Sequence, residues 1–518
     1  MEKKTDENMK IFSTIDKNFN YLNDLFGEGI GLIKNKNEIF ENGMQIGLVY
    51  IDSMTDKMII RDHVLLPILS YSDGQCKNEN AEFFSLSKSG DEFNKSPDDV
   101  LLFIQSRVIS ATNTQITSDM DQVVERILSG CTVLFIEKAK SALIIGSRKA
   151  EKKAVESPEN EATVLGSQES FTDDLSTNMS LMIKRLPAQG LHFEEFTVGT
   201  RSRTKIKLVW LDDIADPRII DEARCRIDNI DIDNVDGIGM LAGLIEDKPM
   251  SLFPKYRQTE RPDVATRNLT DGRFIILCDH SPFAFIAPVM IWDNFRTMDD
   301  YDERSPTSSY LRIVRYISFM LSISISALYL AFVTYNQAIV PPSLALSIAA
   351  GRETVPMPSV VELLLLTFSI SIIREAGLRM PKSVSYFVGT LAAVVIGQAI
   401  VTAGYVSPSL IIVVAISTIS TFAISSTTLV YPSRLLNYFL ILMAGFFGIF
   451  GVINGFVIIF WNLASLSSFG VPYLYPVLPF DKEGFKDVFV RSPFTMLNKR
   501  MKRLSPKNRV SVGKKEKK

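Results

Sequence analysis

The chain has 518 residues, 22% of them charged, and a formal net charge of −2. Residues 1–310 carry −15, residues 311–480 carry +4 and residues 481–518 carry +9. The length favours at least two folding units, and the acidic front argues against a nucleic-acid-binding surface and favours a solvated or partner-facing domain.

The start of the chain, residues 1–20, is polar and shows no short apolar leader. We therefore expect the front half not to be exported and to lie in the cytoplasm.

The four cysteines, Cys76, Cys131, Cys225 and Cys278, are widely spaced and show no CxxC pattern. This spacing favours buried free thiols.

Two stretches of the front half, residues 123–146 and 264–288, share one pattern. In each, a short amphipathic helix ends at a glycine, Gly130 or Gly272, and two apolar strands follow around a polar turn. The pattern predicts two α/β subdomains related by duplication, although such elements also recur by chance. Within the second unit we expect helices at 171–186 and 217–230 and strands near 193–198 and 205–211.

No Asp, Glu, Lys or Arg occurs between Lys382 and Arg434, or between Arg434 and Asp481. A charge at the centre of a spanning helix costs about 2.5–3.5 kcal/mol, so lipid selects against charge. We therefore predict an α+β architecture followed by an α-helical polytopic membrane domain. The expected domains are 1–149 and 164–310 (cytoplasmic α/β), 150–163 (linker), 311–480 (membrane) and 481–518 (basic cytoplasmic tail).

The length of each apolar run decides which runs can cross a bilayer of about 30 Å. Spans are predicted at 313–335, 383–406 and 409–431, whereas 360–373 is short for one crossing and 435–466 is too long for one. Three basic clusters set the expected orientation. They are Arg312 and Arg315 before the first span, Arg374, Arg379 and Lys382 after the short run, and the tail.

If all three clusters are cytoplasmic, the number of crossings is even. Six crossings place all three clusters in the cytoplasm if 360–373 crosses and the last run breaks near Asn454. Four crossings would place the middle cluster on the opposite side of the membrane. For the tail itself, a solvated disordered end fits the composition equally well, and binding to anionic lipid is a further possibility.

The sequence shows little evidence of an enzyme active site or a metal site. His63, His192 and His280 do not have metal-ligand spacing, and the aspartates of 228–236 lack the glycine and final glutamate of a calcium loop. The glycines at 237–243 are not followed by a GK[ST] sequence. We predict no catalytic residue, no metal and no cofactor.

The predicted helix 383–406 has two neighbouring faces that differ in chemistry. Small residues on one face allow a second helix to come close, and an uncharged polar row lies beside them. Such a row could line a water-filled passage between subunits, or its hydroxyls could simply bond backbone carbonyls; both interpretations stay open. The packing candidates are Gly389, Ala393 and Gly397, and the pore-lining candidates are Thr390, Val394, Gln398 and Thr402, continued on the next helix by Ser417, Thr421 and Ser425.

Prolines and charges lie at the edges of the predicted membrane segments. Consecutive prolines would stiffen the loop after the first span, and the charges could form ion pairs at helix ends or belong to a gating loop. The candidates are Pro341, Pro342, Arg352, Glu353, Glu362, Arg374 and Glu375.

Five segments carry a resemblance to a known family. They are FPKYRQTERPD (253–263), SIAAGRETVPMP (347–358), REAGLRMP (374–381), GQAIVTAGYVSP (397–408) and SFGVPYLYP (468–476). In this order they resemble the A subunit of the GerA-type spore germination receptors of endospore-forming bacteria, over residues 18–493. The resemblance implies a cytoplasmic domain of two α/β units and a multi-pass membrane domain in the spore inner membrane.

The resemblance also implies partners and an activity. In that family a transporter-like B subunit is taken to bind the nutrient, a lipoprotein C subunit completes the receptor, and the A subunit is thought to oligomerise into an ion channel. We therefore expect a nutrient-gated cation channel subunit. The alternatives are an accessory channel of the SpoVAF type and a non-conducting scaffold; a secondary transporter is disfavoured because no paired inverted repeat with charged, broken helices is visible.

Overall fold

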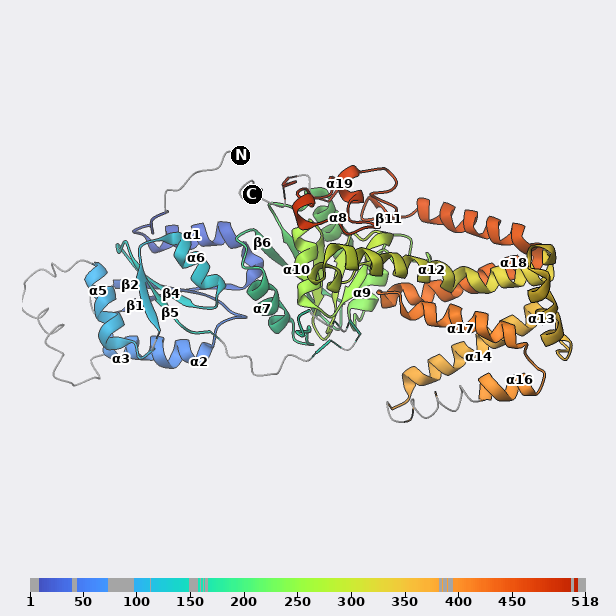
Figure 1. The fold of residues 1–518 in the computed structure, drawn as a ribbon. Coiled ribbons are helices and arrows are strands. Elements are labelled where there is room, and N and C mark those ends of the chain that lie inside the picture. The colour runs from blue at the N-terminus through green and yellow to red at the C-terminus, as the bar shows by residue number, and fades with distance from the viewer. Residues whose placement is uncertain are drawn as a thin grey trace, which may run out of the picture.

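The computed structural model describes residues 9–39, 44–72, 97–111, 113–148, 157–158, 160–161, 163, 166–381, 384, 389, 395–504 and 507–510. Three lobes follow one another along an elongated molecule (Figure 1). We call them the first lobe (residues 9–148), the second lobe (residues 160–304 together with 467–510) and the helical lobe (residues 305–466).

The first lobe is a five-stranded antiparallel sheet with helices on both faces. Val49 and Ile51 of its second strand pack on one face, and Ile46 and Leu48 on the other, because successive side chains of a strand alternate. The strands in spatial order are β1 (Leu32–Ile39), β2 (Met44–Ile51), β4 (Thr132–Ile136), β5 (Ala142–Ile145) and β3 (Thr114–Thr117). The helices are α1 (Ile15–Phe26) and α6 (Met120–Leu128) on one face, and α2 (Lys57–Ile60), η2 (Arg61–Leu65), α3 (Leu66–Ser72), α5 (Pro97–Phe103) and η4 (Ile104–Val108) on the other.

The second lobe repeats this strand order. Its strands in spatial order are β6 (Leu191–Val198), β7 (Thr204–Leu211), β9 (Phe274–Cys278), β10 (Ala284–Ala287) and β8 (Arg257–Thr259). The helices are α7 (Leu175–Arg185) and α10 (Pro262–Thr270) on one face, and α8 (Pro217–Asp228) and α9 (Ile238–Ile245) on the other. The helices and strands expected in this lobe are therefore present, with small shifts at their ends.

The predicted pattern of helix, glycine and hairpin is present in both lobes. Gly130 after α6 has φ +87° and Gly272 after α10 has φ +91°, so each helix ends on a backbone conformation that favours glycine. The hairpin turns also correspond, since Lys138 and His280 both have positive φ. A common origin by duplication stays a prediction.

The first two lobes share one continuous core. Buried residues of both belong to the same apolar cluster, and Lys207 Nζ donates to Gly29 O, 3.1 Å away, across the contact. Gly29, in the short turn η1 (Glu28–Ile30), lies directly against β6. A Cβ on Gly29 would stand 1.0 Å from the Phe193 carbonyl oxygen, so only glycine fits there.

Gly29→Ala should destabilise the chain by about 1–3 kcal/mol, because the added methyl must push the two lobes apart. Gly243→Ala is the matched control: it lies in α9, and an added Cβ would meet no atom within 4 Å. It should raise stability by about 1 kcal/mol through helix propensity. Thermal unfolding of the purified full chain in detergent measures both, and equal midpoints for the two variants would contradict the close packing.

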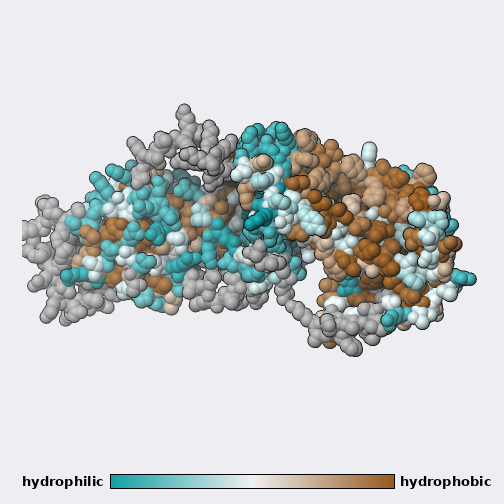
Figure 2. Space-filling model, in the orientation of Figure 1, coloured by the Kyte–Doolittle hydropathy of each residue, from teal (hydrophilic) through white to brown (hydrophobic). Residues whose placement is uncertain are grey.

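The helical lobe carries an exposed apolar surface (Figure 2). Its elements are α12 (Ser305–Thr334), η6 (Gln337–Ile339), α13 (Pro342–Arg352), α14 (Ser359–Arg379), η7 (Val395–Ala399), α16 (Ile400–Thr402), α17 (Pro408–Phe422) and α18 (Thr427–Ala464). Among the described residues, α12 and α18 are long and apolar enough to span a membrane, and α17 is a shorter apolar helix. Large apolar side chains such as Phe368, Phe446 and Trp461 are exposed, which marks a surface that contacts lipid or another protein.

Two of the predicted spans have wrong boundaries. The span 409–431 is not one helix: α17 ends at Phe422, and Ser426, with extended φ and ψ, begins α18 as its N-cap. The run 360–373, which is short for one crossing, belongs to a longer helix, because α14 extends to Arg379 and contains 21 residues. At about 1.5 Å per residue this length matches a hydrocarbon core of about 30 Å.

The long helix α18 is a hairpin that reverses at Gly448. This residue has φ 58° and ψ −138°, and beyond it a side chain on Gly455 would touch Leu440 of the first half. The break therefore lies at Gly448 and not near Asn454. Both ends of α18 lie beside the second lobe, because Ser425 Oγ donates to Asn294 O (2.6 Å) and Lys248 Nζ donates to Ser465 O (3.1 Å).

The chain after α18 returns to the second lobe. Phe469, Val471, Tyr475 and Leu504 join the apolar core around β9 and β10. This segment contains β11 (Ser467–Ser468), β12 (Val471–Pro472), α19 (Lys482–Phe485) and η8 (Phe494–Met496). The alternative of a solvated disordered end is therefore wrong up to Leu504, and residues 511–518 lie outside the described part.

The cysteines are free where described, but only one of them is buried. Cys278 lies in the second core, whereas Cys131 is half-buried and Cys225 is exposed. The expectation of buried thiols is therefore wrong for the latter two, and Cys76 lies outside the described residues. Burial, reinforced by Asp279, raises the pKa of the Cys278 thiol to about 12.

Candidate functional site: a polar cavity in the helical lobe

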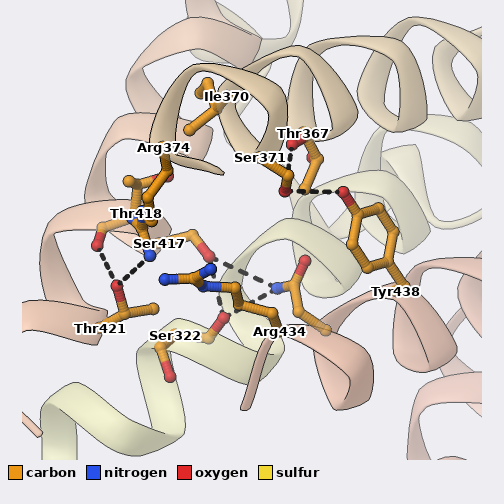
Figure 3. A pocket seen from close by; sticks show the side chains of 11 residues that line it. Ser322, Thr367, Ile370, Ser371, Arg374, Ser417, Thr418, Thr421, Arg434 and Tyr438 are labelled. Carbon is orange, nitrogen blue, oxygen red and sulfur yellow. Dashed lines mark hydrogen bonds between the residues drawn. The ribbon is translucent and has the colours of Figure 1, made fainter. Parts of the chain in front are cut away.

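A polar cavity of about 40 Å³ lies between four helices of the helical lobe, α12, α14, α17 and α18. A cavity of about 10–15 Å³ already holds one water molecule, so this one has room for a small polar ligand. Its lining residues are Ser322, Thr367, Ile370, Ser371, Arg374, Ser417, Thr418, Thr421, Arg434, Asn437 and Tyr438 (Figure 3).

On one side of the cavity, a single backbone carbonyl accepts hydrogen bonds that connect three helices. The Ser322 oxygen of α12 accepts hydrogen bonds from Ser417 Oγ of α17 at 2.9 Å and from Asn437 Nδ2 of α18 at 2.8 Å. All three residues are buried, so these bonds are protected from competing water. On the opposite wall, the hydroxyls of Ser371 and Tyr438 lie 3.0 Å apart and join α14 to α18.

Two arginines give the cavity its charge. Arg374 Nη1 donates to Thr421 Oγ1 at 3.3 Å, and its guanidinium lies 4.9 Å from the centre of the Phe422 ring. The Arg434 guanidinium lies 5.1 Å from the centre of the Tyr431 ring. Among the described residues, neither arginine has a carboxylate oxygen within 4.0 Å.

The chemistry of this lining favours binding over catalysis. Its described side chains offer hydroxyls, an amide and two guanidiniums, and they include no carboxylate, histidine or thiol that could act as a base or nucleophile. Two positive charges without counter-charges disfavour a cation here and favour a group that accepts hydrogen bonds.

Comparison with known proteins places the whole architecture in one family. The family model described as Bacillus/Clostridium GerA spore germination protein matches residues 20–503. The chain belongs to this family. The match includes both α/β lobes, the helical lobe and the returning segment.

Several relatives of this GerA-family chain span nearly its full length. Uncharacterized membrane protein YfkQ of Bacillus subtilis (strain 168) is 34% identical over 476 residues, which cover 92% of this chain and 88% of YfkQ. Spore germination protein KA of the same organism is 31% identical and covers 92% of this chain and 83% of its own length. Spore germination protein GerLA of Bacillus cereus is 34% identical, with 79% and 83% covered.

A solved structure was also found for part of the chain. The crystal structure of the N-terminal domain of the A subunit of the Bacillus megaterium spore germinant receptor GerK3 covers 55% of this chain and 99% of that chain, with 22% sequence identity and a TM-score of 0.39.

The structure distributes the predicted pore residues of this GerA-family chain over three places. Ser417 and Thr421 line the cavity, whereas Ser425 contacts the second lobe through Asn294. Gln398 and Thr402 are exposed, and Thr402 Oγ1 donates to the Gln398 carbonyl of its own helix. Thr390 and Val394 lie outside the described residues.

The predicted packing face has no partner helix where the structure describes it. A Cβ on Gly389 or Gly397 would meet no atom within 4 Å, and both residues are exposed. Ala393 lies outside the described residues. Within one chain these glycines therefore do not serve the close packing expected of them.

At most of the predicted gating residues, the structure lacks the loop or the ion pair that we expect. Pro341 and Pro342 do not stiffen a loop but begin α13, since proline suits the first helical turn. Glu375 pairs with Arg379 at 2.9 Å, as expected for an ion pair near a helix end. The expectation of ion pairs is wrong for the others, because Arg352, Glu353, Glu362 and Arg374 have no opposite charge within 4.0 Å in the described structure.

Glu362 is a buried carboxylate that holds the start of another helix. It is 1% exposed, and its Oε1 accepts from the Ser407 backbone N–H at 2.5 Å and from Ser407 Oγ at 2.7 Å. Ser407 is the N-cap of α17, so the carboxylate also faces the positive end of that helix. Its Oε2 has no hydrogen-bond partner among the described residues.

Glu362→Gln should cost little stability, because the amide oxygen can accept both bonds from Ser407. Glu362→Ala should cost about 1–3 kcal/mol more, since it leaves the buried Ser407 N–H without a partner. Thermal unfolding of the purified full chain in detergent would rank wild type, the Gln variant and the Ala variant in that order. Equal losses in both variants would show that the negative charge itself, rather than the accepted bonds, stabilises α17.

An ionic network that no sequence pattern indicates lies at the junction of the second and helical lobes. Arg312 of α12 is fully buried; its Nη2 lies 3.1 Å from Asp300 Oδ2 and its Nη1 lies 2.9 Å from Asp487 Oδ1. Arg315 adds a 2.7 Å pair with Asp300. Two further elements, η5 (Ile291–Phe295) and α11 (Asp299–Asp302), carry the chain into this junction.

The network favours the ionised form of Asp487 in the folded chain. Although burial alone would raise the pKa of Asp487, its pairing with Arg296 and Arg312 holds that pKa below its usual range. This contribution to stability is present above the pKa of an unfolded aspartate, about 3.9, and is lost as the pH falls further. In the sequence, the two arginines of α12 were visible only as markers of orientation.

Proposed function

We propose that this chain is the A subunit of a nutrient germinant receptor and that its helical lobe crosses the spore inner membrane six times. The returning segment packs on the second lobe, so both ends of the helical lobe lie on one side, which supports an even number of crossings. The six would be α12, α14, the span predicted from the sequence at 383–406, α17 and the two halves of α18. The first and second lobes would then be cytoplasmic, and a transporter-like B subunit and a lipoprotein C subunit would complete the receptor.

In this proposal copies of the chain associate through the face of Gly389 and Gly397 and enclose a path for monovalent cations. The observation that carries the proposal is that this small-residue face has no neighbour in the described structure of one chain. Close approach of helices at small residues is a common mode of association in membranes. The exposed polar residues Gln398 and Thr402 lie next to this face and would line the path.

Gly397→Leu should shift the purified chain from oligomer to monomer and reduce efflux of monovalent cations from liposomes, without lowering the unfolding midpoint of the monomer. The reason is that a Cβ on Gly397 would meet no atom of its own chain within 4 Å, whereas a leucine side chain would hold a second helix away. Gly243→Leu, an exposed glycine of α9, is the control. Unchanged assembly and unchanged flux in the Gly397 variant would contradict this interface.

A second function, a non-conducting scaffold that relays the germination signal, is favoured by one observation. The hydroxyls of Ser417, Thr421 and Ser425 all donate to carbonyls of the chain, as hydroxyls that only hold helices together do. A wild-type oligomer that passes no monovalent ions in liposomes, with and without the B and C subunits, would support the scaffold over the channel. For the accessory channel of the SpoVAF type, a neighbouring gene for a transporter-like B subunit would instead support the receptor.

A further inference from the structure

We propose that the polar cavity of the helical lobe binds a phosphate group through Arg374 and Arg434. The first argument is charge. Both guanidiniums line the same cavity of about 40 Å³, and neither has a carboxylate within 4.0 Å among the described residues. The nearby acid, Glu375, is exposed and is bonded to Arg379. A half-buried pair of like charges is unfavourable until an anion joins it.

The second argument is the unused hydrogen-bonding capacity of the arginines. Arg434 donates no hydrogen bond to a described residue, and its Nε is buried. Arg374 donates one, to Thr421. The aromatic rings beside them stabilise a cation by about 0.5–2 kcal/mol but accept no conventional hydrogen bond. Guanidiniums match the geometry of phosphate oxygens, and the hydroxyl of Thr418 in the same lining could donate to them.

The third argument is the position of the cavity along the helices. Arg374 lies in the last turns of α14, and Arg434 lies two turns into α18, at the ends that face the second lobe. Thr421 is one turn from Ser425, which contacts the second lobe directly. If the lobe is embedded as proposed above, this level coincides with the lipid headgroups rather than the centre of the hydrocarbon. A phosphate is available there from an anionic lipid or from solution.

The test uses the purified full chain in phosphate-free maltoside detergent with three probes. Phosphatidylglycerol supplies a lipid phosphate, inorganic phosphate supplies a free one, and diacylglycerol with the same acyl chains supplies none. The readouts are the thermal unfolding midpoint and retention of the probe in native mass spectrometry. Arg374→Gln and Arg434→Gln are compared with Arg379→Gln, an exposed arginine of α14 paired with Glu375.

Phosphatidylglycerol should stabilise wild type and Arg379→Gln, whereas diacylglycerol should not. Either cavity variant should weaken half-maximal binding about tenfold, the loss expected for a charge-assisted hydrogen bond. Stabilisation by inorganic phosphate alone would support the same site with a soluble ligand. No stabilisation by either phosphate probe, or equal binding in the cavity variants and Arg379→Gln, would overturn the proposal.

Should a Gln variant fail to fold, Arg374→Lys and Arg434→Lys keep the charge and lose only the planar fork. They should fold and still bind phosphate more weakly than wild type. Binding in these variants as tight as in wild type would also overturn the proposal. None of these measurements involves ion flux, so their outcome is separate from that of the channel.

Discussion

Arg312→Met should lower the free energy of unfolding by about 3–5 kcal/mol. The substitution removes the cation between the buried Asp300 and the partly buried Asp487, and it leaves Asp487 without its closest cation. Removing one partner of a buried ion pair is costly because the remaining charge stays in a medium that solvates it poorly. Thermal and urea unfolding of the purified full chain in detergent would measure the loss.

A surface arginine provides the comparison for Arg312. Arg379→Met breaks the ion pair with Glu375. The Arg379 side chain is 80% exposed and the Glu375 side chain 56%, so the change in the free energy of unfolding should be no more than about 1 kcal/mol. The double variant with Asp300→Asn should recover part of the loss caused by Arg312→Met, since less buried charge remains. Equal losses for the Arg312 and Arg379 variants would mean that the junction network does not hold the lobes together.

Gly448→Val should prevent the reversal of α18 and detach the returning segment from the second lobe. A β-branched residue at φ 58° and ψ −138° is strongly strained, at a cost of about 1–3 kcal/mol, and its Cβ would stand 3.0 Å from the Tyr335 ring. Cys278 reports the detachment, because Phe469 of the returning segment belongs to the core that buries it. In a chain that retains only this cysteine, labelling by a maleimide should become much faster.

The labelling experiment has a control in the same lobe. Gly397→Ala introduces a methyl into open space and should leave Cys278 as slow to react as in wild type, where its raised pKa keeps it protonated near neutral pH. Slow labelling in both variants would show that the reversal at Gly448 tolerates a side chain.

Much of the fold could be predicted because local patterns specify it. The helix, glycine and hairpin of each α/β lobe follow from spacing alone, and Gly130 and Gly272 show the expected positive φ. Helix breaks inside uncharged apolar sequence could not be placed the same way. Hydropathy does not distinguish Gly448 from Gly445 or Gly451, and only the packing of the bundle shows that the break lies at Gly448, against Tyr335.

The cavity was predictable only in part, for a different reason. The spacing of Ser417 and Thr421 put them on one face of one helix, and they do line the cavity. Arg374 and Arg434 are far apart in sequence and come from two other helices, so only the packing of the bundle reveals that they meet. In the sequence, Arg374 belongs to one of the basic clusters that set the expected orientation, and Arg434 appears only as the single charge between two uncharged runs.

The return of residues 467–504 to the second lobe has a consequence for the order in which the protein is made. The core of that lobe contains Phe274 and Phe285, but also Phe469 and Leu504, which the ribosome supplies only after every helix of the bundle. The core that the first lobe shares with one face of the second lobe contains only residues made before the helical lobe, so this part can fold early. The rest of the second lobe must wait, with part of its apolar surface uncovered, until the whole helical lobe has been synthesised, so a chain truncated before residue 467 should be a substrate for chaperones and proteases.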